Sequence, residues 1–174
     1  MTRDSAGSIC LKCGLCCNGV IFARGQLRPG DDAALLERIG LELAPQRRGG
    51  GDRKFLQPCR ALDGCRCRIY GQRPEYCRAF ECLLLKGVLA GRVTTAAALR
   101  RIREARAAAA EVDRLLRVLG DEESSLALSL RFNRLRRRLE RSRPGRESAA
   151  AFGDLTVAVH ELNMILAESF YCEG

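Results

Sequence analysis

The sequence has no tryptophan, a single histidine and few aromatic residues, which make up 5% of its 174 residues. One histidine cannot supply a histidine-rich metal site, and no Ser-His-Asp set can be built around it. We expect His160 to be a helix-surface or packing residue. The scarcity of aromatic rings also leaves little surface on which nucleic-acid bases could stack.

Long apolar segments are absent too. Residues 1–9 contain no apolar core, so we expect no secretory signal peptide. The most apolar run, residues 83–90, is interrupted by Lys86 and is much shorter than the roughly 20 residues that span a bilayer. We therefore expect a cytoplasmic protein without membrane association, in which cysteines stay reduced and bind metal rather than form disulfides.

Lysine is scarce although the net charge is +9, because almost all the basic residues are arginines. A basic chain can meet nucleic acid, an anionic surface or an acidic partner. Enrichment in both arginine and alanine is also what a GC-rich coding sequence produces, so charge alone indicates little. The densest basic stretch comprises Arg131, Arg134, Arg136, Arg137, Arg138, Arg141 and Arg143.

Cysteine is abundant, with ten residues, and nine of them precede residue 83. Four lie within eight residues in the run Cys10-Leu11-Lys12-Cys13-Gly14-Leu15-Cys16-Cys17. Thiolates gathered so closely repel one another unless a positive centre neutralises them. This run therefore predicts a metal ion or an iron–sulfur cluster.

A second cysteine group follows in residues 55–82. It contains Pro58-Cys59-Arg60-Ala61-Leu62 and then Cys67-Arg68-Ile69-Tyr70-Gly71-Gln72-Arg73-Pro74-Glu75-Tyr76-Cys77-Arg78-Ala79-Phe80, with Cys82 close behind. With the opening run, this pattern resembles the zinc- or iron-chelating cysteine-cluster family (CxxCxxCC, YkgJ type). The resemblance covers roughly the first half of the chain and supports chelation more than any reaction. It implies these ligands: Cys10, Cys13, Cys16, Cys17, Cys59, Cys67, Cys77 and Cys82.

Other residues of the second group have expected supporting roles. Arg73 and Arg78 belong to the family motif, and we expect them to lie beside the ligands and offset the negative charge of the thiolates. Tyr70 and Phe80 are predicted to pack around the site. Pro74 is predicted to fix a turn or to start a short helix. The additional thiols Cys65 and Cys172 have no assigned role, although Cys65 could replace Cys67 as a ligand.

A shell of sulfur alone excludes magnesium and calcium and suits softer ions. The spacing of Cys10, Cys13 and Cys16 is the one by which ferredoxin loops bind three corners of an iron–sulfur cubane. The Cys-x-x-Cys-Gly opening equally suits zinc. The spacing therefore favours an iron–sulfur cluster slightly over zinc, and both stay open. Adjacent Cys16 and Cys17 point in different directions, which favours two neighbouring metals.

Three functions remain open. The favoured one is a metal-binding protein whose eight cysteines chelate a cluster or zinc, with a redox module as one form of it. The second is a metal-dependent redox or modifying enzyme with an open coordination position. No catalytic pair or nucleotide loop is visible, since Gly49-Gly50-Gly51 has neither a preceding strand nor a Gly-Lys-Ser/Thr ending. The third, less favoured, is a zinc-stabilised module that binds nucleic acid through residues 131–143.

The expected fold is mainly α. Residues 1–88 form an irregular cysteine-rich metal-binding domain, and residues 92–174 form a helical extension that folds as a three-helix antiparallel bundle. Within the first part, Asp31 or Asp32 should cap a short helix that Gly40 stops, and residues 45–52 should form a loop. In the extension, apolar residues recur every three or four positions from Leu99 to Leu119, from Leu128 to Leu139 and from Phe152 to Phe170. Asp121 is expected to cap the second of these helices.

Overall fold

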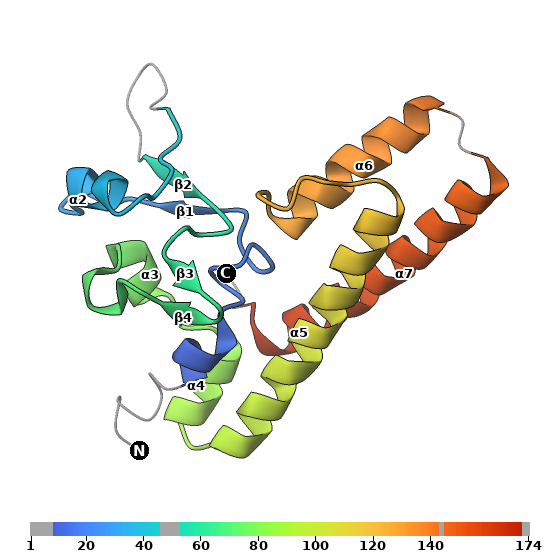
Figure 1. The fold of residues 1–174 in the computed structure, drawn as a ribbon. Helices are drawn as coiled ribbons and strands as arrows, with labels where there is room; N and C mark the ends of the chain where they lie inside the picture. Colours follow the sequence, from blue (N-terminus) through green and yellow to red (C-terminus); the bar gives the residue numbers. More distant parts are fainter. Residues whose placement is uncertain (1–8, 46–52, 143–144, 172–174) are drawn as a thin grey trace.

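The computed structural model describes residues 9–45, 53–142 and 145–171. The chain is mainly helical, with 58% helix and 7% strand. Figure 1 shows a first half built of short helices and strands, followed by long helices that extend away from it. No helix in the described ranges has both the length and the apolar character needed to cross a membrane.

Short elements make up the cysteine-rich half. Residues 9–13 are helical. The elements that follow are β1 (Arg24–Gln26), α2 (Ala33–Arg38), β2 (Lys54–Leu56), β3 (Leu62–Asp63), β4 (Arg66–Cys67), the 3-10 helix η1 (Tyr70–Gln72), α3 (Glu75–Ala79) and α4 (Leu83–Leu89). The strands form two antiparallel pairs, β1 with β2 and β3 with β4. None of the strands is long enough to give a readable alternation of apolar and polar residues.

The first strand pair is held by a close approach of ring and backbone. Gly25 of β1 stands opposite Phe55 of β2, and a Cβ added to Gly25 would lie 2.0 Å from the Phe55 ring. Phe55 is buried and forms the centre of a small hydrophobic core with Leu27, Leu36 and Leu41. This small core supports one side of the cysteine-rich half.

The predicted short helix is confirmed as α2. The side chain of Asp32 accepts a hydrogen bond from the backbone N–H of Leu35, and Gly40 follows the helix with φ +86°. The cap and the stop are therefore the two residues that the sequence indicated. The predicted loop of residues 45–52 lies outside the described residues except for Pro45.

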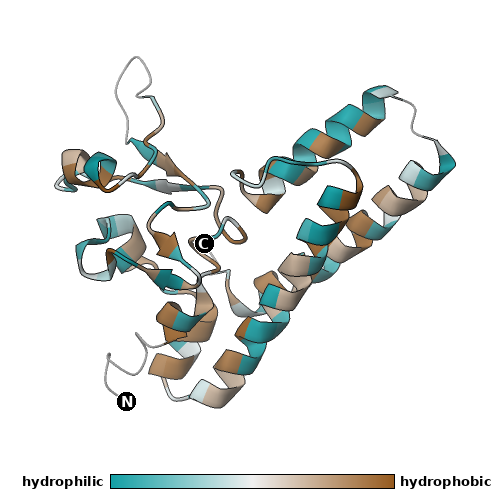
Figure 2. Cartoon of the chain, viewed as in Figure 1, coloured by the Kyte–Doolittle hydropathy of each residue, from teal (hydrophilic) through white to brown (hydrophobic). Residues whose placement is uncertain are grey.

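The long helices of the second half are α5 (Thr95–Val118), α6 (Leu128–Ser142) and α7 (Arg146–Ser169). Thr94 caps α5 by accepting from the N–H of Ala97, and Gly120 follows its end with φ +77°. The three predicted helices are thus confirmed as elements. Figure 2 shows each as a mixture of hydrophobic and hydrophilic residues, with α6 the most hydrophilic along its length.

The three-helix bundle itself is not confirmed. Helices α5 and α7 run antiparallel along one another, with Arg101 near the start of α5 bound to Glu168 and Ser169 at the end of α7. Helix α6 instead contacts α5 near the C-terminal end of α5. Phe132 of α6 also stacks on Phe152 of α7, with 6.0 Å between the ring centroids. The helices therefore form a long pair with α6 against one end of it.

Asp121 does not cap α6, which begins seven residues later. Its side chain accepts a 2.7 Å hydrogen bond from Nε of Arg131, whose side chain is only 4% exposed. Arg131 also donates to Asp113 of α5 at 2.6 Å. The carboxylate is thus used to neutralise a buried arginine between α5 and α6, an arrangement that requires tertiary contact and has no local signature.

The large hydrophobic core is continuous across both halves. It joins Ile9, Leu15 and Val88 from the first half with Ile102 of α5 and Leu166 of α7. Helix α4 packs against both α5 and α7. Because this core spans the boundary near residue 90, the cysteine-rich half rests directly on the helical pair. The division into two domains at that boundary stays a prediction.

Candidate metal centre

Nine cysteines lie in the described residues, and all of them line one cavity of about 360 Å³. These are Cys10, Cys13, Cys16, Cys17, Cys59, Cys65, Cys67, Cys77 and Cys82. Each is a free thiol and is partly buried. The fold thus brings together all eight predicted ligands and the additional thiol Cys65. The tenth cysteine, Cys172, lies outside the described residues.

The first motif is a short helix followed by a tight turn. Residues 9–13 are helical, which puts Cys10 and Cys13 three residues apart on one helix face. Gly14 then adopts φ +70°, and its carbonyl accepts from the N–H groups of Cys17 and Asn18 at 2.9 Å. A Cβ at Gly14 would lie 3.1 Å from the Cα of Cys65. This turn needs glycine both for its backbone conformation and for the space beside Cys65.

The second motif is brought to the first by a backbone hydrogen bond. The N–H of Cys59 donates to the carbonyl of Cys17 at 2.7 Å. Cys67 lies in β4 opposite Leu62 of β3. The N–H groups of Ala61 and Leu62 approach the Cys59 sulfur and act to lower its pKa, although burial leaves that pKa raised overall. Amide groups aimed at a sulfur are typical of cysteines that serve as thiolate ligands.

The last two ligand candidates lie on consecutive short helices. Cys77 is in α3, which starts directly after Pro74 as predicted. Cys82 immediately precedes α4, and its Sγ accepts from the N–H of Leu85 at 3.4 Å. Asp31 fixes α3 from a distant part of the chain, because its carboxylate accepts from the N–H of Glu75 at 2.8 Å and from that of Arg28 at 2.9 Å. Sequence reasoning offered Asp31 only as a cap for α2.

Burial governs the acidity of these thiols. It raises the pKa of Cys13, Cys17 and Cys77 to about 12, and that of Cys16 well above its ordinary value. Desolvation is the largest cause in each case, followed in Cys16, Cys17 and Cys77 by neighbouring thiolates. Without a positive centre these groups are therefore protonated thiols at neutral pH. A metal that binds them must displace their protons.

The neighbours of each thiol define a first thiol group. The thiolates that raise the pKa of Cys13, after burial, are Cys82 and Cys10. Those that raise the pKa of Cys16 are Cys13, Cys17, Cys82 and Cys10, in decreasing order. The first thiol group consists of Cys10, Cys13, Cys16 and Cys82.

A second thiol group lies beside it. After burial, the thiolates that raise the pKa of Cys17 are Cys59, Cys77 and Cys67, with Cys13 contributing last. Cys59 and Cys67 likewise act on Cys77. The second thiol group consists of Cys17, Cys59, Cys67 and Cys77. The two groups adjoin at the Cys16–Cys17 peptide.

Arg73 lies against both groups. Its guanidinium carbon is 3.5 Å from the centroid of the Tyr70 ring, and its Nε donates to the Tyr70 carbonyl at 2.8 Å. From there its positive charge acts to lower the pKa of Cys10 and of Cys77, against the larger effect of burial. Arg78 lines the same cavity. Arg68 acts in the same sense on the pKa of Cys59.

Aromatic side chains form part of the cavity wall. Phe22 packs edge-on against Phe80 and Tyr76, with ring centroids 4.8 Å and 5.9 Å apart. Phe80 therefore packs around the site, as predicted. Tyr70 also lines the cavity, and it serves as the platform on which Arg73 is stacked. Together these rings reduce the access of water to the thiols.

The thiols share a cavity without closing on a common point. Among the described residues, no three cysteine, histidine, aspartate or glutamate side chains already stand in the arrangement of a metal site. The donor set nevertheless fits a soft or borderline metal, because cysteine sulfurs far outnumber the other donor in the half-buried cavity, the Glu81 carboxylate, and arginines flank them. Rotation of the side chains about χ1 would be needed to bring four sulfurs onto one ion.

The basic stretch of α6 is largely engaged within the protein. Arg131 is buried with two aspartates, Arg134 pairs with Glu123, and Arg136 pairs with Glu140. Arg138 donates to the carbonyls of Leu119 and Gly120. Four arginines of the stretch thus have partners within the protein, and none of these contacts requires a bound ligand. His160 is exposed on α7, as expected, and does not line the cavity.

Comparison with known proteins identifies the first half of the chain. No curated protein and no solved structure matches the chain. A family model described as "Putative zinc- or iron-chelating domain" matches residues 9–99, more than half of the sequence. The match contains every cysteine that lines the cavity and extends into the first turn of α5. The chain therefore belongs to the CxxCxxCC family of zinc- or iron-chelating domains.

Proposed function

We propose that this protein binds metal through eight cysteines: Cys10, Cys13, Cys16, Cys17, Cys59, Cys67, Cys77 and Cys82. The observation that carries the proposal is that residues from both motifs, up to 72 positions apart, line one cavity. Burial makes their thiolates unfavourable on their own, so a metal supplies the charge that such a cluster requires. Arg73 and Arg78 lie beside the ligands and offset the remaining negative charge.

An iron–sulfur cluster is the favoured cofactor, and zinc is the alternative. Three thiols of the first group have the two-residue spacing of ferredoxin loops, and Cys82 can act as the remote fourth ligand. A cluster would give the protein a one-electron redox function, whereas zinc in a closed sulfur shell would stabilise the fold. In either case the cysteine-rich half, with its short strands and small core, depends on the metal for stability.

The ligand assignment is tested by replacing Cys13 and Cys77 separately by serine. Each replacement removes one thiol from a different motif and leaves the cavity almost unchanged in volume. We expect each variant, purified without oxygen, to contain less metal than the unmodified protein and to unfold at lower denaturant concentration. Cys65→Ser is the matched control and should retain its metal. Unchanged metal content in both the Cys13 and Cys77 variants would overturn the assignment.

A further inference from the structure

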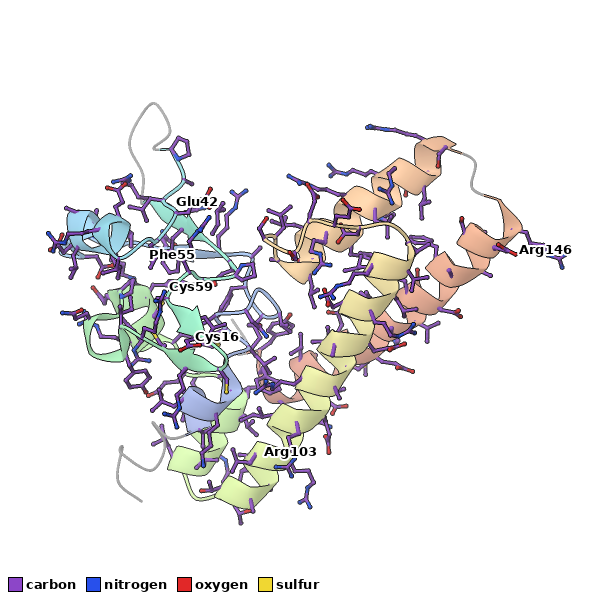
Figure 3. The ribbon with its side chains drawn as sticks, viewed as in Figure 1. Cys16, Glu42, Phe55, Cys59, Arg103 and Arg146 are labelled. Atoms are coloured by element: carbon purple, nitrogen blue, oxygen red, sulfur yellow. The ribbon has the colours of Figure 1, made fainter. Side chains whose placement is uncertain are left out.

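We propose that the eight cysteines form two separate four-thiolate metal sites, one from the first thiol group and one from the second. This inference rests on the proposed function and adds the pairing of ligands that the sequence does not give. Figure 3 labels one member of each group, Cys16 and Cys59. The two groups lie on different hydrophobic cores, which favours two sites over a single cluster with spare thiols.

The first thiol group rests on the large hydrophobic core. Cys13, Cys16 and Cys82 all pack against that core, which includes Ile9 and Leu84. Residues 9–13 supply two of the thiols from one helix face, and Cys82 enters from the start of α4. Cys16 follows in the turn after Gly14, so the helix, this turn and the start of α4 bring the four thiols to one supporting core.

The second thiol group rests on a different support. Cys59 and Cys77 pack against the small core around Phe55 and Ala61. Cys67 lies in β4, whose partner strand β3 starts three residues after Cys59. Cys17 joins them through the hydrogen bond from the N–H of Cys59 to its carbonyl. Because the two cores are distinct, the thiols they support belong to two separate centres.

The Cys16–Cys17 peptide is the junction between the centres. Consecutive side chains leave the backbone in different directions, so adjacent cysteines are poorly placed to bind one tetrahedral ion together. One of the pair packs on the large core, and the other is tied to Cys59. The junction thus contributes one ligand to each site and holds the two sites as neighbours.

Arg73 gives the pair of sites a shared counter-charge. Four thiolates around Zn²⁺, or around a cubane cluster, leave a net charge of about −2, so two adjacent sites repel one another. Arg73 lines the cavity that the two groups share. A single arginine stacked on Tyr70 therefore lowers the cost of placing both sites in one cavity.

The test is a titration with Co²⁺, a coloured substitute for zinc and ferrous iron in sulfur sites. The full-length protein is stripped of metal under argon, and the sulfur-to-cobalt charge-transfer band is followed as Co²⁺ is added. We expect saturation at two equivalents per chain. Cys65→Ser, which removes the thiol that belongs to neither group, should also saturate at two.

Double variants that remove the same number of thiols distinguish the pairing. Cys10→Ser with Cys82→Ser removes two ligands of the first group, and Cys59→Ser with Cys77→Ser removes two of the second. Each should lower the saturation point from two equivalents to one. Cys10→Ser with Cys77→Ser takes one ligand from each group and should weaken both sites. The far-ultraviolet circular dichroism of each variant, to which α5 and α7 contribute most as the longest helices, reports whether the variant still folds.

Single variants serve if a double variant does not fold. Cys82→Ser and Cys59→Ser should each weaken one equivalent of Co²⁺ and leave the other unchanged. Saturation of the unmodified protein at one equivalent would overturn the two-site proposal while leaving the proposed function intact. Equal losses in the within-group and cross-group double variants would do the same. If the unmodified protein binds no Co²⁺ at all, both proposals are wrong.

Discussion

The N–H of Cys59 donates a 2.7 Å hydrogen bond to the carbonyl of Cys17 and thereby joins two cysteine motifs that are 42 positions apart. This bond fixes the backbone of one motif against the other. Contacts within the protein thus place the thiols of both motifs in one cavity. What remains for the metal is to gather sulfurs that are already neighbours, which lowers the conformational entropy lost on binding.

Gly14→Ala should destabilise the protein more than Gly91→Ala. Both glycines adopt φ +70°, where alanine costs roughly 1–2 kcal/mol. At Gly91 a Cβ would meet nothing within 4 Å, whereas at Gly14 it would crowd the Cα of Cys65 at 3.1 Å. Urea unfolding should show the larger loss for Gly14→Ala, and only that variant should lose metal. Equal losses would mean that the turn tolerates the contact with Cys65.

Arg73→Gln should weaken metal binding by about 10-fold or more, the effect typical of residues that orient or neutralise metal ligands. The substitution removes a positive charge that lies near one thiol of each group. Arg60→Gln is the control, because Arg60 is exposed and pairs with Glu42 at 3.7 Å. Competition with a chelator of known zinc affinity measures both variants. Equal affinities in the two would contradict the role assigned to Arg73.

Metal affinity should rise with pH. Burial raises the pKa of Cys13, Cys17 and Cys77 to about 12 in the absence of metal, so these thiols carry protons throughout the neutral range. Each must lose its proton to become a ligand, and a higher proton concentration therefore opposes binding. Zinc binding measured from about pH 6 to pH 8 should strengthen steadily and release protons. An affinity independent of pH would show that the ligands are not thiols of this kind.

Arg131→Ala should cost about 3–5 kcal/mol of unfolding free energy, because it leaves the buried carboxylate of Asp121 without its partner and takes from Asp113 one of its two arginine partners, the other being Arg117. Arg134→Ala removes a neighbouring but exposed arginine that pairs with Glu123, and it should cost no more than about 1 kcal/mol. Both values come from urea unfolding. Metal content should be unaffected in both variants, since neither arginine lines the cavity. A loss of metal in Arg131→Ala would show that α6 supports the site.

The sequence predicts the elements in which an apolar repeat extends over many residues or in which a strong local signature marks the ends. Helix α5 is 24 residues long, an apolar repeat runs along it, and Thr94 and Gly120 mark its ends, so the sequence alone predicts it. Asp32 and Gly40 similarly bound α2. The cysteine motifs are recognisable in the sequence because the spacing of their cysteines is typical of metal sites. The fold then brings these cysteines into one cavity, which spacing alone does not establish.

Tertiary contacts account for what the sequence did not reveal. The strands have only two or three residues each, which is too short for an alternating pattern. Arg131 lies in a run of arginines that is typical of a solvated helix face, yet two aspartates from α5 and the following loop bury it. Asp31 holds α3 through a partner 44 positions away. The contacts of Arg131 and of Asp31 depend on residues distant in sequence, which local reasoning cannot place.

The most direct test of the central claim is the iron, zinc and acid-labile sulfide content of the protein purified without oxygen, together with its absorption spectrum. We predict bound metal: iron with matching sulfide and a broad visible band that bleaches on reduction, or, as the alternative, zinc in a colourless protein. Protein that is folded, fully reduced and free of both metals would contradict the account.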